Sequence, residues 1–290
     1  MARPLDHLVL PTADLGIARE RLGRLGFTVA PRGVHPFGTE NCCVYFEGGT
    51  FIEPLAVADE AAAAAAAKTG NVFVARDRFY RESFGPEGFS AVVFGSEDAD
   101  DDHRRYVESG ISAGDRLDFS RPFVDASGKS DIASFRLAFA AEPGMRGTFV
   151  FACQRVNAPR VDRSALQTHA NGATGIAEIV AVSADPAGMA DFLRVAADAD
   201  GSAANGSGIL ELPNARIATL TPDRYSQRFG LPCDPHGSLA FAAVVFSVRD
   251  ITFLRMHLAS GNIDHDMRGN RIVVAAAPGQ SAAFIFEEHS

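Results

Sequence analysis

Three residues near the start of the chain have types and surroundings that suit proton transfer or metal binding. His7 lies in the apolar, strand-like run 5–10, and Glu53 interrupts the apolar run 51–57. A buried carboxylate is costly unless it is paired, hydrogen-bonded or bound to a metal. His35 lies in a loop with Gly and Pro, where it would be a third ligand or a general acid/base, because imidazole titrates near neutral pH. The structural alternative is a neutral His7 hydrogen-bonded in a sheet and a Glu53 at a strand end.

Other polar residues could complete the same site. Thr39 and Asn41 follow His35 in its loop and could orient a carbonyl or carboxylate group of a substrate, although Asn41 equally suits a turn. His169 and Asn171 could reach the site from the middle of the chain, or they belong to an Asn-Gly turn. The sequence contains no P-loop, GxGxxG or Ser/His/Asp motif.

Composition limits the classes of partner and compartment. The chain has 290 residues, which suits two domains or one large one, and a formal charge of −9. This charge disfavours nucleic acid and anionic membranes as partners, and no apolar run approaches the ~20 residues of a membrane helix. The four cysteines show no CxxC spacing. We therefore expect reduced thiols in a cytoplasmic protein whose partner is a small molecule.

The elements that must position these residues come from an internal duplication. The segment FSAVVF at 89–94 is repeated as FAAVVF at 241–246, and each copy is followed by a charged helical stretch. A Pro-Gly pair precedes an apolar strand at 143–151 and again at 278–286. The offset between the halves is larger near their openings, which indicates extra length in the first half at 59–83, where seven alanines predict a helix longer than its counterpart.

Each half divides again into two units of the form βαβββ. In the first unit the pattern predicts a strand at 5–10, a helix at 15–25, and strands at 27–30, 41–46 and 50–55. In the second it predicts a strand at 89–94, a helix at 99–108, and strands near 116–119, 133–140 and 148–154. The predicted fold class is therefore α+β. The expected divisions are a first domain at 1–155, a linker at 156–172 and a second domain at 173–290.

The sequence resembles a known superfamily. The segments that carry the resemblance are DHLVL at 6–10, LGFTV at 25–29, HPFGTEN at 35–41, FIEPL at 51–55 and HANGATG at 169–175. Together with the four βαβββ units they resemble the glyoxalase-like domain proteins of the vicinal oxygen chelate superfamily. The resemblance implies four modules paired into two glyoxalase-like domains, each with a curved sheet around a cup.

The same resemblance implies a divalent metal in the first cup, held by residues of the opening and closing strands of each module. The matching residues of the first module are His7 and Glu53. The second module departs from the pattern, because Ser90 stands where a histidine is expected and Gln154 is the nearest oxygen donor on the closing strand. Two interpretations follow: His7, Glu53 and Gln154 hold Zn, Fe, Mn, Ni or Mg, or the cup binds an organic ligand without metal. His35 would be catalytic, and Thr39, Asn41, Ser90 and His169 would bind substrate.

The second half lacks most of these polar groups. Glu178 takes the place of His7, and an apolar or hydroxyl set replaces the Glu53 region, so we expect this half to be structural, to form a homodimer or to be a degenerate pocket. The ligand site is then expected in the first half, with the 59–83 segment near its rim. The resemblance implies a metal-dependent lyase, isomerase or dioxygenase acting on a small oxygenated molecule. The alternative is a binding protein that sequesters a small compound, as bleomycin-resistance relatives do.

Overall fold

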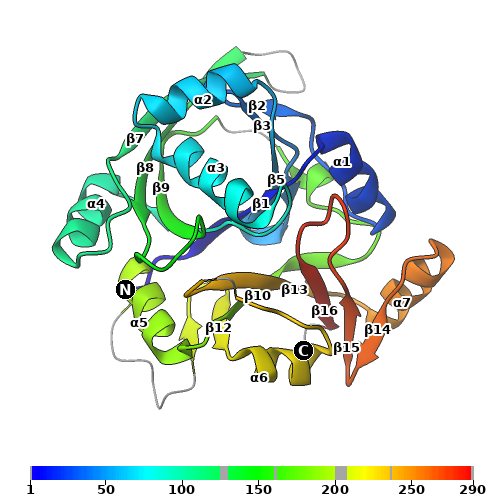
Figure 1. Ribbon diagram of the computed structural model, residues 1–290. Helices are drawn as coiled ribbons and strands as arrows, with labels where there is room; N and C mark the ends of the chain where they lie inside the picture. The colour runs from blue at the N-terminus through cyan, green and yellow to red at the C-terminus, as the bar shows by residue number, and fades with distance from the viewer. Residues whose placement is uncertain (1, 125–129, 160–161, 200–207, 236, 289–290) are drawn as a thin grey trace.

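The protein is a mixed α+β chain with two β-sheets, shown in Figure 1. The computed structural model describes residues 2–124, 130–159, 162–199, 208–235 and 237–288. One sheet is built from the first half of the chain and the other from the second half. Within the described residues, no helix has the length and apolar character needed to cross a membrane.

The first sheet has nine strands in the order β2-β3-β5-β1-β6-β9-β8-β7, with β4 also paired to β5. Its strands are β1 (Leu5–Pro11), β2 (Gly33–Val34), β3 (Thr39–Asn41), β4 (Val44–Tyr45), β5 (Phe51–Val57), β6 (Ala91–Ser96), β7 (Leu117–Val124), β8 (Ser130–Ala140) and β9 (Phe149–Asn157). At the centre β1 and β6 are antiparallel, while β5 runs parallel to β1 and β9 parallel to β6. A short helix, η1 (Glu47–Gly49), connects β4 to β5.

Four helices accompany this sheet: α1 (Leu15–Arg24), α2 (Glu60–Lys68), α3 (Val72–Phe84) and α4 (Ala99–Glu108). The alanine-rich segment forms two helices, not one, because Gly70 adopts a left-handed φ of 94° and Asn71 caps α3. Helix α3 lies across the concave face of the sheet in Figure 1. Hydrogen bonds fix α3 to β5 and to the segment before β9. Arg81 donates to the Leu55 carbonyl at 2.8 Å, and Arg76 donates to the Met145 carbonyl at 3.1 Å.

The second sheet has seven strands in the order β11-β12-β10-β13-β16-β15-β14. Its strands are β10 (Ala173–Val182), β11 (Ile209–Glu211), β12 (Arg216–Leu220), β13 (Ala240–Val248), β14 (Asp266–Arg268), β15 (Arg271–Val274) and β16 (Ala283–Glu288), and its helices are α5 (Pro186–Ala196), α6 (Pro222–Phe229) and α7 (Ile251–Ser260). The centre repeats the first sheet: β10 and β13 are antiparallel, with β12 parallel to β10 and β16 parallel to β13.

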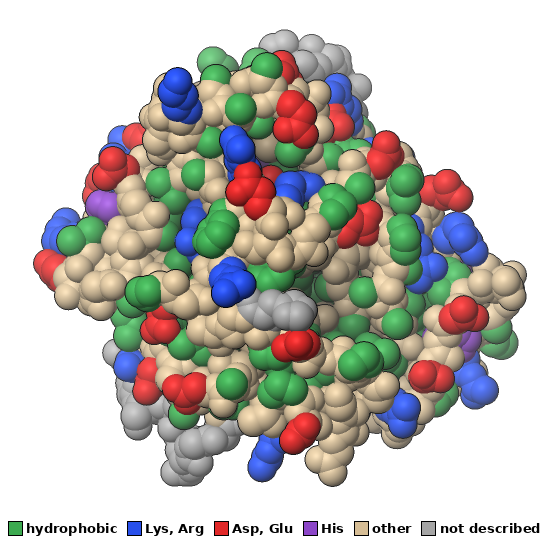
Figure 2. Space-filling view, viewed as in Figure 1, with side chains coloured by type: hydrophobic (Ala, Val, Ile, Leu, Met, Phe, Trp, Pro, Cys, Tyr) green, Lys and Arg blue, Asp and Glu red, His purple; other side chains and the backbone are tan. Residues whose placement is uncertain are grey.

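The two halves share one hydrophobic core. The Phe27 ring lies 5.3 Å from the ring of Phe246 and 6.0 Å from that of Phe284, and one buried cluster contains residues of both sheets. The connection between the sheets contains a short helix, η2 (Ser164–Leu166). All four cysteines are free thiols. On the face shown in Figure 2, Lys and Arg side chains are interspersed with Asp and Glu side chains and do not form a basic stripe.

Three of the predicted strands differ from the observed ones. The strand predicted at 41–46 is two short strands, β3 and β4, with Cys42 and Cys43 between them. Residues 27–30 form no regular strand, and the first hairpin of the sheet begins at Gly33 instead. The strand expected near 116–119 is β7, which continues through Pro122 to Val124. Proline is tolerated there because β7 is at the edge of the sheet and needs no second partner for its backbone N–H groups.

Candidate functional site

Side chains from seven strands, two loops and α3 meet in a pocket on the concave face of the first sheet. His7 pairs with Phe51 on one side and Val93 on the other, and Val93 pairs with Phe151. Because side chains alternate between the faces of a strand, this register puts odd-numbered residues of all these strands on the concave face. We call this cavity of about 60 Å³ the first-sheet pocket; its lining is His7, His35, Phe37, Asn41, Cys43, Tyr45, Phe51, Glu53, Phe73, Phe119, Arg121, Phe135, Leu137, Phe151 and Cys153.

His7 is held between two carboxylates. Its Nδ1 lies 2.6 Å from Oδ1 of Asp6, and its Nε2 lies 3.4 Å from Oε2 of Glu53. The pairing of β1 with β6 shifts register between Leu5 and His7, an irregularity of the kind that re-aims side chains beside functional sites. Burial lowers the pKa of His7, but the two carboxylates outweigh burial and raise it overall. Phe51 stacks on the imidazole, with ring centroids 4.4 Å apart.

Glu53 is a buried, ionised carboxylate. Asn41 Nδ2 donates to Glu53 Oε1 at 2.6 Å, and His7 faces the other oxygen. Burial raises the pKa of Glu53, but His7, His35 and Asn41 together lower it to about 2. The cost of burying this charge is therefore offset by specific partners, as expected for a carboxylate in an apolar strand.

His35 comes from the loop after β2 and is fully enclosed. Its Nδ1 lies 2.9 Å from Oγ1 of Thr39, and its Nε2 lies 3.7 Å from Oε1 of Glu53. Burial lowers the pKa of His35 to about 4, with Arg121 and His7 adding to the shift and Glu53 opposing it. The imidazole is therefore neutral at pH 7, and its Nε2 can donate or accept a proton beside Glu53.

The donors of His7, Glu53 and His35 satisfy part of what a divalent metal requires. Donor atoms about 2.0–2.2 Å from one metal lie roughly 3 Å apart, close to the His7–Glu53 separation of 3.4 Å. A metal binds an ionised carboxylate and a neutral imidazole, so Glu53 has the binding form, whereas His7, with its raised pKa, would release a proton to solvent on binding. Among the described residues, however, no group of three or more His, Cys, Asp or Glu side chains is placed as a complete ligand cluster. His7 and Glu53 thus fit a partial set, and water or substrate would supply the other ligands.

Thr39 and Asn41 are in the pocket region but are engaged by other side chains. The Thr39 hydroxyl contacts His35, and the Asn41 amide contacts Glu53. We infer that they position these two groups, in place of the substrate contacts expected from the sequence. Partners of this kind fix the orientation of metal-binding and proton-transferring side chains.

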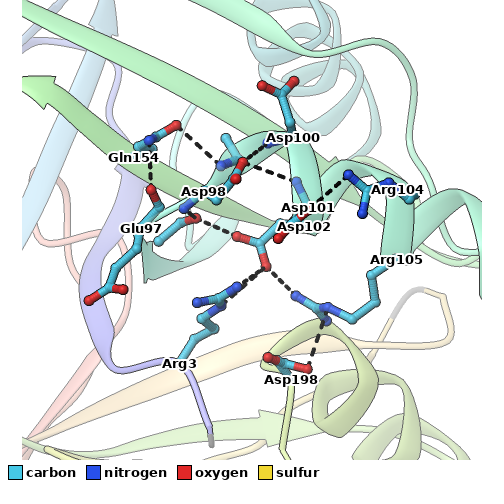
Figure 3. Close-up of polar contacts among 12 residues, drawn as sticks. Arg3, Glu97, Asp98, Asp100, Asp101, Asp102, Arg104, Arg105, Gln154 and Asp198 are labelled. Atoms are coloured by element: carbon cyan, nitrogen blue, oxygen red, sulfur yellow. Dashed lines mark hydrogen bonds and ion pairs between the residues drawn. The ribbon is translucent and has the colours of Figure 1, made fainter.

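Gln154 lies outside the first-sheet pocket, contrary to the expectation that it would join His7 and Glu53. Its Nε2 donates to the Glu97 carbonyl at 2.6 Å, and its Oε1 accepts from the Ala99 N–H at 3.2 Å (Figure 3). The even-numbered Gln154 occupies the face of β9 opposite Cys153, so the cysteine lines the pocket and the glutamine holds the start of α4. Burial raises the pKa of Cys153, which keeps it a thiol.

Ser90 and His169 also lie outside the pocket. Ser90 precedes β6 on the even-numbered face, and its buried hydroxyl finds no hydrogen-bond partner among the described residues. His169 accepts from the Thr28 N–H at 3.0 Å through Nδ1 and donates to the Tyr45 carbonyl at 2.9 Å through Nε2. It therefore joins the connection between the halves to the first sheet.

In the second sheet, an ion cluster occupies the place that corresponds to His7. Glu178 pairs with Val245 of β13, as His7 pairs with Val93 of β6. It accepts from Arg216 Nε at 2.8 Å and from Arg228 Nη2 at 2.9 Å. Burial raises the pKa of Glu178, but the two arginines outweigh burial and lower it.

Helix α6 fills the remaining space on this face of the second sheet. Its Tyr225 and Phe229 belong to a buried cluster with Val180, Val245 and Ile285. Arg228, on the same helix, reaches Glu178. The face that corresponds to the first-sheet pocket is thus closed by a helix and an ion cluster.

Sequence reasoning missed three residues that shape the first-sheet pocket. Asp6 was treated only as a neighbour of His7, although a carboxylate next to a buried histidine is a recognisable signal. Phe73 reaches the pocket from α3, and its role depends on a helix packed inside the cup. Arg121 was missed because the strand predicted near 116–119 ends before it, whereas β7 continues to Val124.

Comparison with known proteins agrees with this architecture. Residues 5–196 match the model of the glyoxalase-like domain family. A hypothetical protein from Staphylococcus aureus has a similar fold, with 13% identity, a TM-score of 0.59, and coverage of 98% of this chain and 99% of its own. A triple mutant of 4-hydroxymandelate synthase from Streptomyces coelicolor is similar at 15% identity and a TM-score of 0.57, covering 99% of this chain and 93% of its own.

A third similar structure is a fusion of a xylose isomerase-like TIM barrel with a 4-hydroxyphenylpyruvate dioxygenase. It is 13% identical, with a TM-score of 0.52, and the match covers 99% of this chain and 49% of the fusion protein. No curated protein matches the sequence. At these identities the structural likenesses establish the fold alone. The family match over residues 5–196 shows that the chain belongs to the glyoxalase-like domain family.

Proposed function

We propose that the chain is a divalent-metal-dependent enzyme that acts on a small oxygenated organic molecule in the first-sheet pocket. The observation that carries this proposal is the convergence of His7, His35 and Glu53 in a cavity otherwise lined mostly by aromatic rings. Each of the three has a second partner that fixes it: Asp6, Thr39 and Asn41, respectively. Such preorganisation is typical of sites that bind a metal or move a proton.

His7 and Glu53 would hold the metal, which when bound acts as a Lewis acid toward neighbouring oxygens of the substrate. Asp6 holds the His7 ring through Nδ1, so that Nε2 faces Glu53. His35, neutral at pH 7, exchanges a proton with the substrate through Nε2. The aromatic rings exclude water, which strengthens the electrostatic interactions inside the pocket. This arrangement supports lyase, isomerase or dioxygenase chemistry. Two similar structures are those of a hydroxymandelate synthase and of a fusion protein with a dioxygenase, so the fold is one that carries such reactions.

The domain organisation is part of the same proposal. We propose four βαβββ modules paired into two domains, at 1–155 and 173–290, joined by a linker at 156–172. The central antiparallel pairs β1–β6 and β10–β13, each flanked by parallel partners, support this division. The closed face of the second sheet supports a structural role for the second domain.

Metal binding tests the proposal directly. Protein purified without chelators is analysed for metal content, and Co²⁺ is titrated while its visible absorption is recorded. We expect about one metal per chain, and a loss of at least tenfold in Co²⁺ affinity in Glu53→Gln and His7→Gln. Glu82→Gln is the matched control, because Glu82 is an exposed residue paired with Arg78 on the surface of α3. The proposal is wrong if the protein contains no metal and neither Co²⁺ nor Zn, Fe, Mn, Ni or Mg ions raise its melting temperature.

The aromatic lining favours a second candidate, a protein that sequesters a planar compound without catalysis. Phe37, Phe73 and Phe119 form a connected group of rings, with centroids 5.2 and 5.7 Å from that of Phe37. For this candidate, ligand affinity would survive replacement of both His7 and Glu53 by Ala. Loss of all binding in that double variant would exclude it.

A further inference from the structure

Arg121 brings a positive charge into the first-sheet pocket from the edge strand β7. Its odd number places it on the concave face, and it lies in the pocket lining. Its guanidinium carbon lies 5.9 Å from the centroid of the Phe135 ring. Phe119, two residues earlier on β7, packs against the His35 ring at 5.9 Å. The arginine therefore shares the cavity with the proposed catalytic groups.

The curvature of the sheet brings this arginine to the opposite edge strand. A Cβ built on Gly33 of β2 would lie 2.9 Å from Arg121 Nη1 and 2.4 Å from Asn41 Oδ1. The two side chains thus approach the same point beside Gly33. Since Asn41 donates to Glu53, the guanidinium lies next to the polar corner of the pocket.

The charge of Arg121 has no counterion in the part of the chain that the structure describes: no carboxylate there forms an ion pair with it. Arg121 is half-buried, so its guanidinium is only partly hydrated, and a charged group in such surroundings is normally paired. An anionic group of a ligand would supply the missing partner.

We propose that Arg121 binds the carboxylate of the substrate, so that the first-sheet pocket selects a small carboxylic acid. A guanidinium and a carboxylate form two parallel charge-assisted hydrogen bonds, which fix both position and orientation. The body of the acid would lie among Phe37, Phe119 and Phe135. A second oxygen would then face His7 and Glu53. This inference names the substrate class of the proposed function and rests on that function for its catalytic meaning.

Matched acids and amides test the inference. Binding of benzoate, benzamide, acetate and acetamide to the purified protein is measured by calorimetry and thermal shift. We expect at least one carboxylate to bind ten times more tightly than its amide. In Arg121→Met we expect carboxylate affinity to fall by about 10- to 100-fold, the range for a hydrogen bond to a charged group. Arg121→Lys keeps the charge without the two-pronged geometry, so its carboxylate affinity should lie between those of the wild type and Arg121→Met.

The control variant is Arg104→Met, since Arg104 is an exposed residue of α4 that pairs with Asp101. It should bind all four probes as the wild type does. The circular dichroism spectrum and melting temperature of Arg121→Met show whether that variant keeps its fold, and we expect both to be close to those of the wild type. If Arg121→Met fails to fold, Arg121→Lys alone must show the loss of affinity.

The outcomes separate this inference from the proposed function. It is overturned if neither carboxylate binds, if amides bind as tightly as acids, or if the Arg121 variants bind benzoate and acetate as the wild type does. If the wild type binds no metal, the proposed enzymatic function fails. A carboxylate preference that depends on Arg121 would still stand in that case, as a property of a binding protein.

Discussion

Replacing Glu178 by Gln should weaken the second sheet without affecting the first-sheet pocket. The side chain of Glu178 is only 1% exposed and accepts hydrogen bonds from both Arg216 and Arg228. Glutamine keeps the shape but removes the charge. Its NH₂ group, a hydrogen-bond donor, would face the N–H donors of at least one guanidinium, so that hydrogen bond would be lost. The perturbation thus tests whether Glu178 serves stability alone.

The expected loss follows from the burial of the three partners. Removing one member of a buried ion pair costs about 3–5 kcal/mol. Because the Arg216 side chain is 37% exposed, water screens part of the interaction, and we expect about 2–3 kcal/mol here. An unfolding entropy of ~2.1 cal/mol/K per residue gives about 0.6 kcal/mol/K for this chain, so the melting temperature should fall by about 3–5 °C.

Urea denaturation and Co²⁺ titration of the Glu178→Gln protein provide the assay, with Glu82→Gln as the exposed control. The difference from the wild type should also depend on pH. The folded-state pKa of Glu178 lies below the ordinary 4.5, so its contribution is complete above about pH 4.5 and is lost as the pH falls toward the folded-state pKa. The reasoning is refuted if Glu178→Gln is as stable as the wild type at pH 7, or if a folded Glu178→Gln protein no longer binds Co²⁺.

Three further predictions concern other parts of the molecule. Gly33→Ala should reduce Co²⁺ affinity about tenfold, because the new Cβ would displace Asn41 from Glu53, whereas Gly175→Ala, with open space at its Cβ, should have no effect. His169→Gln should leave Co²⁺ binding intact and lower the urea midpoint at pH 7. Since burial lowers the pKa of His169, the wild type should lose stability as the pH falls below 6.5, and the variant should lose less. Gln154→Ala should cost about 1 kcal/mol in urea denaturation, through the lost contacts to α4, with unchanged Co²⁺ affinity.

The sequence was informative about the fold and about one half of the candidate site. Repeated apolar segments predicted the duplication, and apolar alternation predicted most of the strands that form the two sheets. His7 and Glu53 were conspicuous because each interrupts an apolar run, where a polar group needs a reason to be buried. The structure brings them to 3.4 Å from each other.

The remaining residues depended on register, which a single sequence does not specify to within one residue. The sequence predicts Gln154 as the nearest oxygen donor on the closing strand, yet a difference of one residue places a side chain on the opposite face. Arg121 escaped notice because the strand predicted near 116–119 ends before it, whereas β7 continues to Val124 at the edge of the sheet, where proline is tolerated. The position of α3 inside the cup is a tertiary contact, and helix propensity carries no information about it.

The placement of odd-numbered residues on the concave face has a consequence for how this protein can change during evolution. A substitution in β1 or β5 alters one side chain, but a single-residue deletion before His7 or Glu53 within its strand would exchange the lining with the opposite face. Pro54 would then point into the cup in place of Glu53, unless a bulge absorbed the change. Insertions and deletions should therefore be confined to the connections between the strands. A library of single-residue deletions scored for Co²⁺ binding would show binding retained in the loops and lost within β1 and β5.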